Sequence, residues 1–217
     1  MPKLSVEAMK KALDWAYDKA VNGLPGTDTA EELAQGYLRK ATSVEEAAKS
    51  LIRWQTSKSA TSGFLTGLGG AVTLPVTIPA NIASVLYVQT RMIAAIAWMG
   101  GYDLRDDKVQ TFVYMCMCGN GVKDLLKNIG MEIGIKLTKS AIQKISGKAL
   151  AEINKKVGFR LLTKFGSSGV INLGKLVPGV GGVIGGTADG IATATIGKVA
   201  MKLFIQPGNG GRTAPVA

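Results

Sequence analysis

The side chains that most often perform chemistry are scarce in this sequence. None of its 217 residues is a histidine, which excludes His-based catalytic triads, His metal sites and His pH switches. The two cysteines, Cys116 and Cys118, are separated by one residue in an apolar run, and in a helix their side chains would point about 200° apart. We therefore expect two small buried side chains in a reducing cytosol, and neither a disulfide nor a metal site.

The acidic residues fit helix capping better than catalysis. Asp103 is placed to cap a helix, with Asp106 at its third position, and the spacing of Asp103, Asp106 and Asp107 does not follow a calcium loop. Two hydroxyl–carboxylate pairs have the spacing of a capping box: Thr29 with Glu32, and Ser43 with Glu46. No nucleophile–base pair is present. The sequence therefore predicts no catalytic residue, no metal ligand and no cofactor, and a protein that is not an enzyme.

The basic residues are the polar feature that points to a partner. The formal net charge is +11, and residues 123–175 contain 11 basic and 3 acidic residues. Apolar positions spaced three or four apart from Ile142 to Leu161 predict an amphipathic stretch. On another face we expect a lysine cluster that is either solvated or docked on anionic lipid headgroups: Lys144, Lys148 and Lys155, helped by Lys136 and Lys139.

Two apolar segments rich in glycine complete the pattern. No charged residue occurs from 59 to 90, and the helix expected from about Pro79 to Met99 would be about 31 Å long, close to the hydrocarbon thickness of a bilayer. Spacings of four place glycines on one helix face, where a second backbone can approach closely. The predicted helix-packing glycines are Gly63, Gly67, Gly182, Gly186 and Gly190.

Each apolar segment contains a lone charge. Arg91 lies inside the first expected helix, which favours a buried or partly inserted helix over a simple transmembrane span, because an arginine in lipid is costly. Asp189 is the only acidic residue after Glu152. We expect Arg91 and Asp189 to form a buried ion pair.

The elements that must position these residues are helices. We expect an all-α fold of about eight helices, a single multi-helix domain with two apolar glycine-rich central helical segments, over residues 1–205, followed by a disordered tail at 206–217. The expected helices lie near residues 6–22, 30–40, 44–58, 79–99, 105–128, 142–161 and 183–204.

Several unusual blocks also follow one another along the chain: Ser62–Gly70 (SGFLTGLGG), Leu74–Pro75, Ile78–Asn81 (IPAN), Gln89–Ala97 (QTRMIAAIA), Gly100–Leu104 (GGYDL) and Val177–Gly186 (VPGVGGVIGG), with Asp189. In this order they resemble the EcsC family of bacterial proteins, over residues from about 16 to 205. The family is named from an operon neighbour of an ABC transporter. The resemblance implies a helical protein with no settled activity, and it carries over no site residue.

Three functions from different classes stay open. The first is a non-enzymatic cytoplasmic protein, peripheral or partly inserted at the inner membrane, that binds anionic lipid and inserts a Gly-rich hairpin near residues 63–99. The second is a pore-forming or membrane-perturbing effector that oligomerises through glycine zippers. The third is a soluble basic module for an acidic protein or nucleic acid. Nucleic acid is the less favoured partner, because aromatic residues are few and no known binding motif occurs. A homo-oligomer or a membrane-protein partner fits the first two functions.

Overall fold

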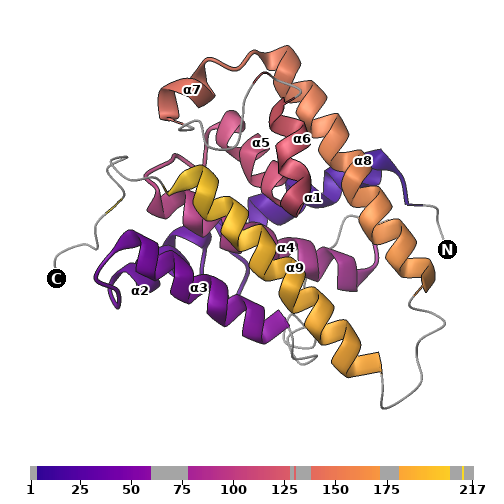
Figure 1. The fold of residues 1–217 in the computed structure, drawn as a ribbon, viewed down its shortest axis with the longest axis horizontal. Helices are drawn as coiled ribbons and strands as arrows, with labels where there is room; N and C mark the ends of the chain where they lie inside the picture. Colours follow the sequence, from indigo (N-terminus) through magenta and orange to yellow (C-terminus); the bar gives the residue numbers. More distant parts are fainter. Residues whose placement is uncertain are drawn as a thin grey trace.

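The computed structural model describes residues 4–59, 78–127, 130, 138–171, 181–205 and 212, without the side chains of 58, 59, 80, 81, 166–171 and 181–189. Within these ranges the chain forms helices and no strand: α1 (Val6–Asn22), α2 (Ala30–Leu38), α3 (Val44–Ser59), α4 (Ala80–Met99), α5 (Asp107–Cys116), a 3-10 turn (Gly119–Gly121), α6 (Val122–Lys127), α7 (Lys139–Gln143), α8 (Gly147–Ile171) and α9 (Gly181–Phe204). The expected all-α fold is confirmed (Figure 1).

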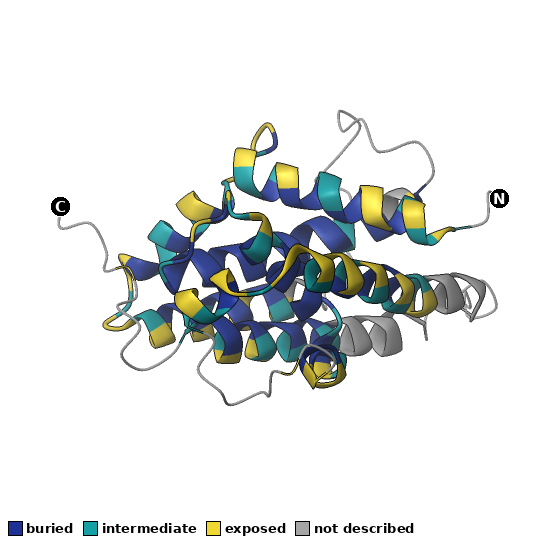
Figure 2. Cartoon of the chain, turned by 90° about the horizontal axis from the view of Figure 1, so that it is seen from above, coloured by how far each residue is buried: buried dark blue, intermediate teal, exposed yellow. Residues whose placement is uncertain are grey.

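Helix α4 forms the centre of the fold. It contacts α1, α2, α3, α5 and α9, and every residue from Met92 to Met99 is buried. The window Ile82–Met99 has the length and composition of a membrane-crossing helix, with a mean hydropathy of 1.4, yet 89% of it is buried inside the protein. The apolar composition of α4 is therefore used for packing against its neighbours in this fold (Figure 2).

The two central helices, α4 and α9, run parallel. Gln89 donates a hydrogen bond to the Thr193 hydroxyl (3.2 Å), and eleven residues further on in each helix Gly100 lies against the backbone of Phe204. A Cβ atom added to Gly100 would be 2.1 Å from the Phe204 carbonyl oxygen. A side chain at position 100 is therefore incompatible with this approach of the two helix ends.

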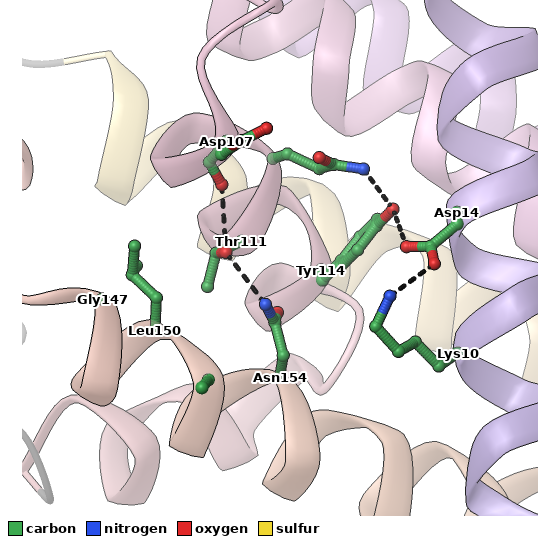
Figure 3. A pocket seen from close by; sticks show the side chains of 10 residues that line it. Lys10, Asp14, Asp107, Thr111, Tyr114, Gly147, Leu150 and Asn154 are labelled. Atoms are coloured by element: carbon green, nitrogen blue, oxygen red, sulfur yellow. Dashed lines mark hydrogen bonds and ion pairs between the residues drawn. The ribbon is translucent and has the colours of Figure 1, made fainter.

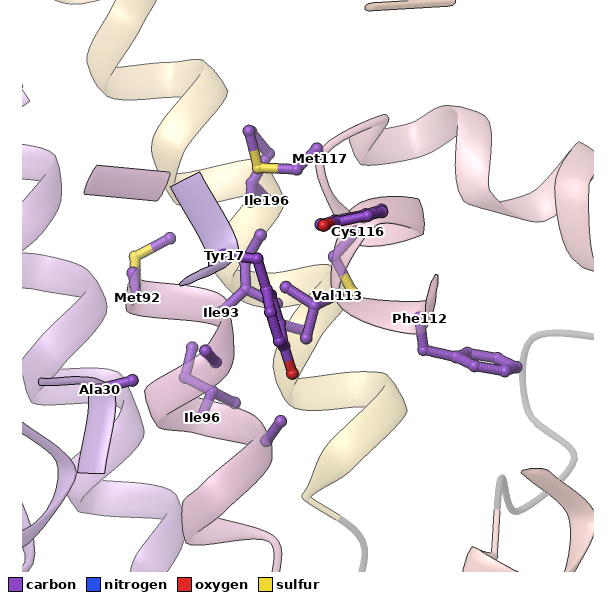
Figure 4. Packing of buried hydrophobic residues seen from close by; sticks show 14 of the residues in the cluster. Tyr17, Ala30, Met92, Ile93, Ile96, Phe112, Val113, Cys116, Met117 and Ile196 are labelled. Carbon is purple, nitrogen blue, oxygen red and sulfur yellow. The ribbon is translucent and has the colours of Figure 1, made fainter. Parts of the chain in front are cut away.

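Buried side chains from four helices meet beside α4. Tyr17 of α1, Ile93 of α4, Val113 of α5 and Ile196 of α9 belong to one hydrophobic cluster (Figure 4). The Tyr17 hydroxyl donates a hydrogen bond to the Leu104 carbonyl (2.7 Å), so its polar atom is satisfied. Burial, with the negative charges of nearby aspartates, raises the pKa of Tyr17, which therefore stays neutral throughout the physiological range.

The two cysteines pack as the sequence predicts. Cys116 is fully buried and Cys118 is partly buried, both as free thiols. Burial raises the pKa of the Cys118 thiol to about 11.

We expect both thiols to react slowly in the native protein. A pKa near 11 for Cys118, against the ordinary value of 9.0, lowers its thiolate fraction at neutral pH about a hundredfold. Colorimetric thiol titration with and without denaturant measures this difference. Rapid labelling of Cys118 in the folded protein would show that it is not buried in this way.

The chain expected to form one helix over residues 105–128 is divided instead. Helix α5 ends at Cys116, and Gly119 has a φ of +56°, which terminates the helix before α6 begins at Val122. The cap also differs from the expectation: Asp106, not Asp103, accepts the hydrogen bond from the Lys108 amide (2.8 Å). Asp103 instead closes a turn by accepting from the Arg105 amide.

The first capping box is confirmed and the second is altered. Thr29 and Glu32 bond each other's backbone amides reciprocally. Ser43 accepts from the Glu46 amide, but the Glu46 carboxylate accepts from the amide and hydroxyl of Thr42. These hydrogen bonds lower the pKa of both carboxyl groups.

One residue of the expected tail is placed against the fold. The Arg212 amide donates to the Met99 carbonyl (2.9 Å), and its guanidinium lies 4.4 Å from the centre of the Trp98 ring. Position 212 is therefore docked at the end of α4, where the sequence predicted disorder. The other residues of 206–217 lie outside the described part of the chain.

Candidate membrane-binding surface

The predicted lysine cluster lies on α7, on α8 and on the segment that joins them. Lys139 is in α7, Lys144 follows the end of α7, and Lys148 and Lys155 are in α8. All four side chains are exposed. Lys136 lies outside the described residues. Four of the five predicted lysines are thus exposed on α7, on α8 or between them, and we call the exposed side of these two helices the α7–α8 face.

The expected continuous amphipathic stretch is divided at Ser146. Helix α7 ends at Gln143, and the Ser146 hydroxyl accepts a hydrogen bond from the Ala149 amide at the start of α8 (3.3 Å). The sequence predicted that Lys144, Lys148 and Lys155 share one helix. In the structure Lys144 lies outside the helix that contains the other two. The predicted apolar positions Ile142, Ile153, Val157 and Leu161 are nevertheless buried.

Contacts on its inner side fix the orientation of α8. Arg160 donates to the carbonyl of Gly121 (2.6 Å), which precedes α6, and pairs with Asp124 of α6 (2.9 Å). Gly158 lies beside Val6 of α1, since a Cβ at position 158 would be 3.1 Å from the Val6 side chain. With its inner side held against α1 and α5, α8 presents a defined outer side to solvent (Figures 1 and 2).

The exposed side of α8 also contains an aromatic residue that the sequence analysis did not single out. Phe159 is 61% exposed, one of three large apolar side chains with such exposure in the described part of the chain. Lys148, Lys155 and Phe159 are seven and four positions apart, so they lie along one side of the helix. The nearest acidic residue of α8, Glu152, is paired with Lys156 (2.7 Å), and that pairing lowers its pKa.

The lysines of the α7–α8 face differ in their contacts within the protein. The Lys139 ammonium lies 5.8 Å from the centre of the Tyr102 ring, a cation–π contact within the protein. Lys144, Lys148 and Lys155 make no ion pair within the described residues. These three lysines and Phe159 are the groups of the α7–α8 face that are best placed to meet an external surface.

Close packing at glycines is observed in the described residues at positions that the sequence analysis did not name. Gly190 is buried, but Gly63 and Gly67 lie outside the described residues, and so do the surroundings of Gly182 and Gly186. Close approaches between helices are observed at Gly100 against Phe204, and at Gly197, where a Cβ would be 2.6 Å from the Ile52 side chain; at Gly121 an added Cβ would meet the Arg160 guanidinium. None of these glycines has the four-residue spacing on which the prediction depended. The role of the predicted glycines therefore stays a prediction.

Arg91 is buried, as expected, and holds the loop between α1 and α2. Its Nη1 donates to the Asp28 carbonyl (3.0 Å) and to the Tyr87 hydroxyl (3.4 Å), and its Nε has no partner among the described residues. Since the Thr27 hydroxyl donates to the Leu24 carbonyl, it accepts the hydrogen bond of the Tyr87 hydroxyl (2.8 Å). Asp189 belongs to α9, but its side chain lies outside the described set, so the Arg91–Asp189 pair stays a prediction.

These features define a helical domain built around a buried apolar helix, with a basic face on α7 and α8. Within the described ranges, no group of three cysteine, aspartate or glutamate side chains could hold a metal ion. The chain belongs to the EcsC protein family, whose model matches residues 2–206. No curated protein and no solved structure matches it.

Proposed function

We propose that this protein is a non-enzymatic cytoplasmic protein that binds the anionic surface of the inner membrane through its α7–α8 face. The observation that carries the proposal is the outer side of α8, where the exposed Phe159 lies one turn from Lys155 and on the same side of the helix as Lys148. Lysines near an anionic membrane contribute about 1 kcal/mol each, and an exposed aromatic ring can enter the headgroup region. The net charge of +11 strengthens the attraction.

The central apolar helix does not need lipid in this arrangement. Residues 80–99 of the expected Gly-rich hairpin form α4, which is covered by protein, and residues 63–77 lie outside the described part of the chain. Peripheral binding by the α7–α8 face is therefore favoured over insertion of α4. A pore formed through glycine zippers is the alternative that the same experiment distinguishes.

We expect the protein to sediment with vesicles that contain about 30% phosphatidylglycerol and not with pure phosphatidylcholine vesicles. Replacing Lys144, Lys148 and Lys155 by Gln should weaken this binding at least severalfold, with an upper limit of about a hundredfold from the energy per lysine. Raising the salt from 0.1 M to 1 M shortens the Debye length from about 10 Å to about 3 Å and should have a similar effect.

The matched control replaces three exposed lysines elsewhere, Lys11, Lys40 and Lys49, by Gln, giving the same net charge. If both triple variants lose binding equally, net charge and not the α7–α8 face is responsible. Phe159→Ser should reduce the binding that persists at high salt, because that part depends on the ring. Leakage of an entrapped dye would favour the pore, and salt-sensitive binding to DNA without vesicle binding would contradict the membrane proposal.

A further inference from the structure

A pocket lies between α1, α5 and α8, on residues that the lipid-binding proposal does not use. Its volume is about 290 Å³, the lower end of the range for small-molecule sites. Lys10 and Asp14 of α1, Thr111 and Tyr114 of α5, and Asn154 of α8 all contribute to its wall (Figure 3). Three helices that are far apart in sequence therefore supply polar groups to one small cavity.

Most polar atoms of the wall already make hydrogen bonds with each other, and the donor and acceptor of each bond can be assigned. The Tyr114 hydroxyl accepts from Gln110 (2.6 Å) and donates to Asp14 (3.0 Å), whose other oxygen pairs with Lys10 (2.5 Å). Burial and the negative charge of Asp14 raise the pKa of Tyr114, so its hydroxyl keeps its proton and continues to donate.

Asn154 leaves one acceptor without a partner. The Thr111 hydroxyl donates its only hydrogen to the Asp107 carbonyl (3.0 Å), so it must accept from the Asn154 amide group (3.2 Å). This fixes the orientation of the amide. The Asn154 Oδ1 is buried and has no hydrogen-bond partner among the described residues, an arrangement that costs free energy unless a donor is supplied.

The polar atoms of the pocket that have no partner are hydrogen-bond acceptors. Asp107 also belongs to the lining of the pocket, and its carboxylate makes no hydrogen bond or ion pair with any described residue. The charges of Asp14 and Lys10 offset each other in their ion pair, so Asp107 leaves the lining with a net negative charge. A ligand suited to this wall carries N–H donors and positive charge.

We propose that this pocket binds a small ligand through a primary ammonium group, which donates a hydrogen bond to Asn154 Oδ1 and is attracted by Asp14 and Asp107. The ammonium belongs either to a free amine or to the ethanolamine headgroup of a phospholipid. Binding of a free amine requires no membrane contact, so this inference is independent of the proposed lipid-binding function.

The test uses ethanolamine with the full-length protein labelled with ¹⁵N, and follows by NMR the backbone amides of the residues that line the pocket, with the Asn154 side-chain amide as an additional signal in the parent protein. We expect a saturable shift with a Kd of about 0.1–10 mM, which suits a ligand of four heavy atoms. Choline, which has the charge without N–H donors, and ethylene glycol, which has hydroxyl donors without the charge, should bind at least tenfold more weakly. No saturable shift, or equal binding of all three compounds, overturns the proposal.

Variants separate binding from folding. Asn154→Leu should reduce ethanolamine binding at least tenfold, whereas Asn154→Asp, which keeps an acceptor and adds charge, should retain or increase it. Lys10→Met removes the competing ammonium at the rim and should strengthen binding severalfold. Glu152→Gln, on α8 but outside the pocket, is the control and should change nothing. Loss of binding in Asn154→Asp or in Lys10→Met would contradict the assignment.

The source of the ammonium is decided by a second comparison. If vesicles of phosphatidylethanolamine and phosphatidylcholine capture the protein better than phosphatidylcholine alone, and Asn154→Leu abolishes the difference, the ligand is the lipid headgroup. If ethanolamine binds in solution and the vesicles show no such difference, the ligand is a free amine. Either result supports an ammonium site, and failure of vesicle binding alone bears only on the proposed function.

Discussion

Gly100→Ala should lower the free energy of unfolding by about 3 kcal/mol, because its new Cβ would be 2.1 Å from the Phe204 carbonyl oxygen and 2.9 Å from the carbonyl carbon. The obstructing atoms belong to the backbone of α9, so a rotation of a side chain cannot relieve the contact. For a protein of this size, the loss corresponds to a decrease in Tm of about 6–12 °C. Urea and thermal denaturation measure it.

The matched control for this variant is Gly147→Ala. Gly147 begins α8 and has no atom within 4 Å of an added Cβ, so alanine there should leave stability unchanged or raise it slightly. If Gly100→Ala is as stable as Gly147→Ala, the ends of α4 and α9 do not approach as closely as described. A loss of similar size in both variants would instead indicate a general effect of removing glycine.

Replacing Arg91 by Gln is expected to cost about 2–4 kcal/mol of stability. The variant leaves the Asp28 carbonyl without its donor, removes a contact with Tyr87 and detaches the α1–α2 loop from the central helix. Arg39, which is exposed, offers the matched control, and Arg39→Gln should change stability by less than about 0.5 kcal/mol. Chemical denaturation of the two variants makes the comparison.

Double-mutant cycles identify the partners of Arg91. Combining Arg91→Gln with Tyr87→Phe should cost less than the sum of the two single changes, because the two side chains are in direct contact. The same result with Asp189→Asn is expected if the predicted ion pair forms. Additive losses with Asp189→Asn would show that these two charges do not interact, and additive losses with Tyr87→Phe would contradict the observed contact.

Helix boundaries marked by local signals could be predicted from the sequence. Pro79 and the Gly100–Gly101 pair delimit α4, which the structure places at Ala80–Met99. The breaks before α6 and α8 also have local signals, in Gly119–Gly121 and in Ser146. These signals were overlooked because the apolar positions on either side stay in helical register across each break.

The closest packing could not be predicted, because it depends on partners far away in the chain. The Gly100–Gly101 pair predicts the end of a helix. Nothing in the neighbouring sequence indicates that Phe204 will lie against the α-carbon of Gly100. The same holds for Arg91: an arginine among apolar residues suggests a carboxylate partner, whereas the described contacts are a backbone carbonyl and a tyrosine.

The lysines of the candidate site could be predicted from the sequence, whereas the exposure of Phe159 was not predicted. Lys148 and Lys155 lie on an amphipathic pattern, so their exposure follows from the burial of Ile153 and Val157. Phe159 falls on the lysine side of α8, away from the apolar stripe, but an aromatic residue is usually buried, so its residue type alone suggests the opposite. Because Gly158 has no side chain, α8 packs closely against Val6 of α1 at this position. This packing turns Phe159 toward solvent.

The parallel arrangement of α4 and α9 has a consequence for the newly made chain. Helix α4 is complete at residue 99, but the helix that covers one of its sides is complete only at residue 204. At a synthesis rate of about 5–20 residues per second, α4 waits about 5–20 s for this partner. Helices α1, α2 and α3 are already made by then, so ribosome-bound intermediates lack the cover on the side of α4 that meets α9, and chaperones that bind nascent apolar helices have that interval in which to engage it.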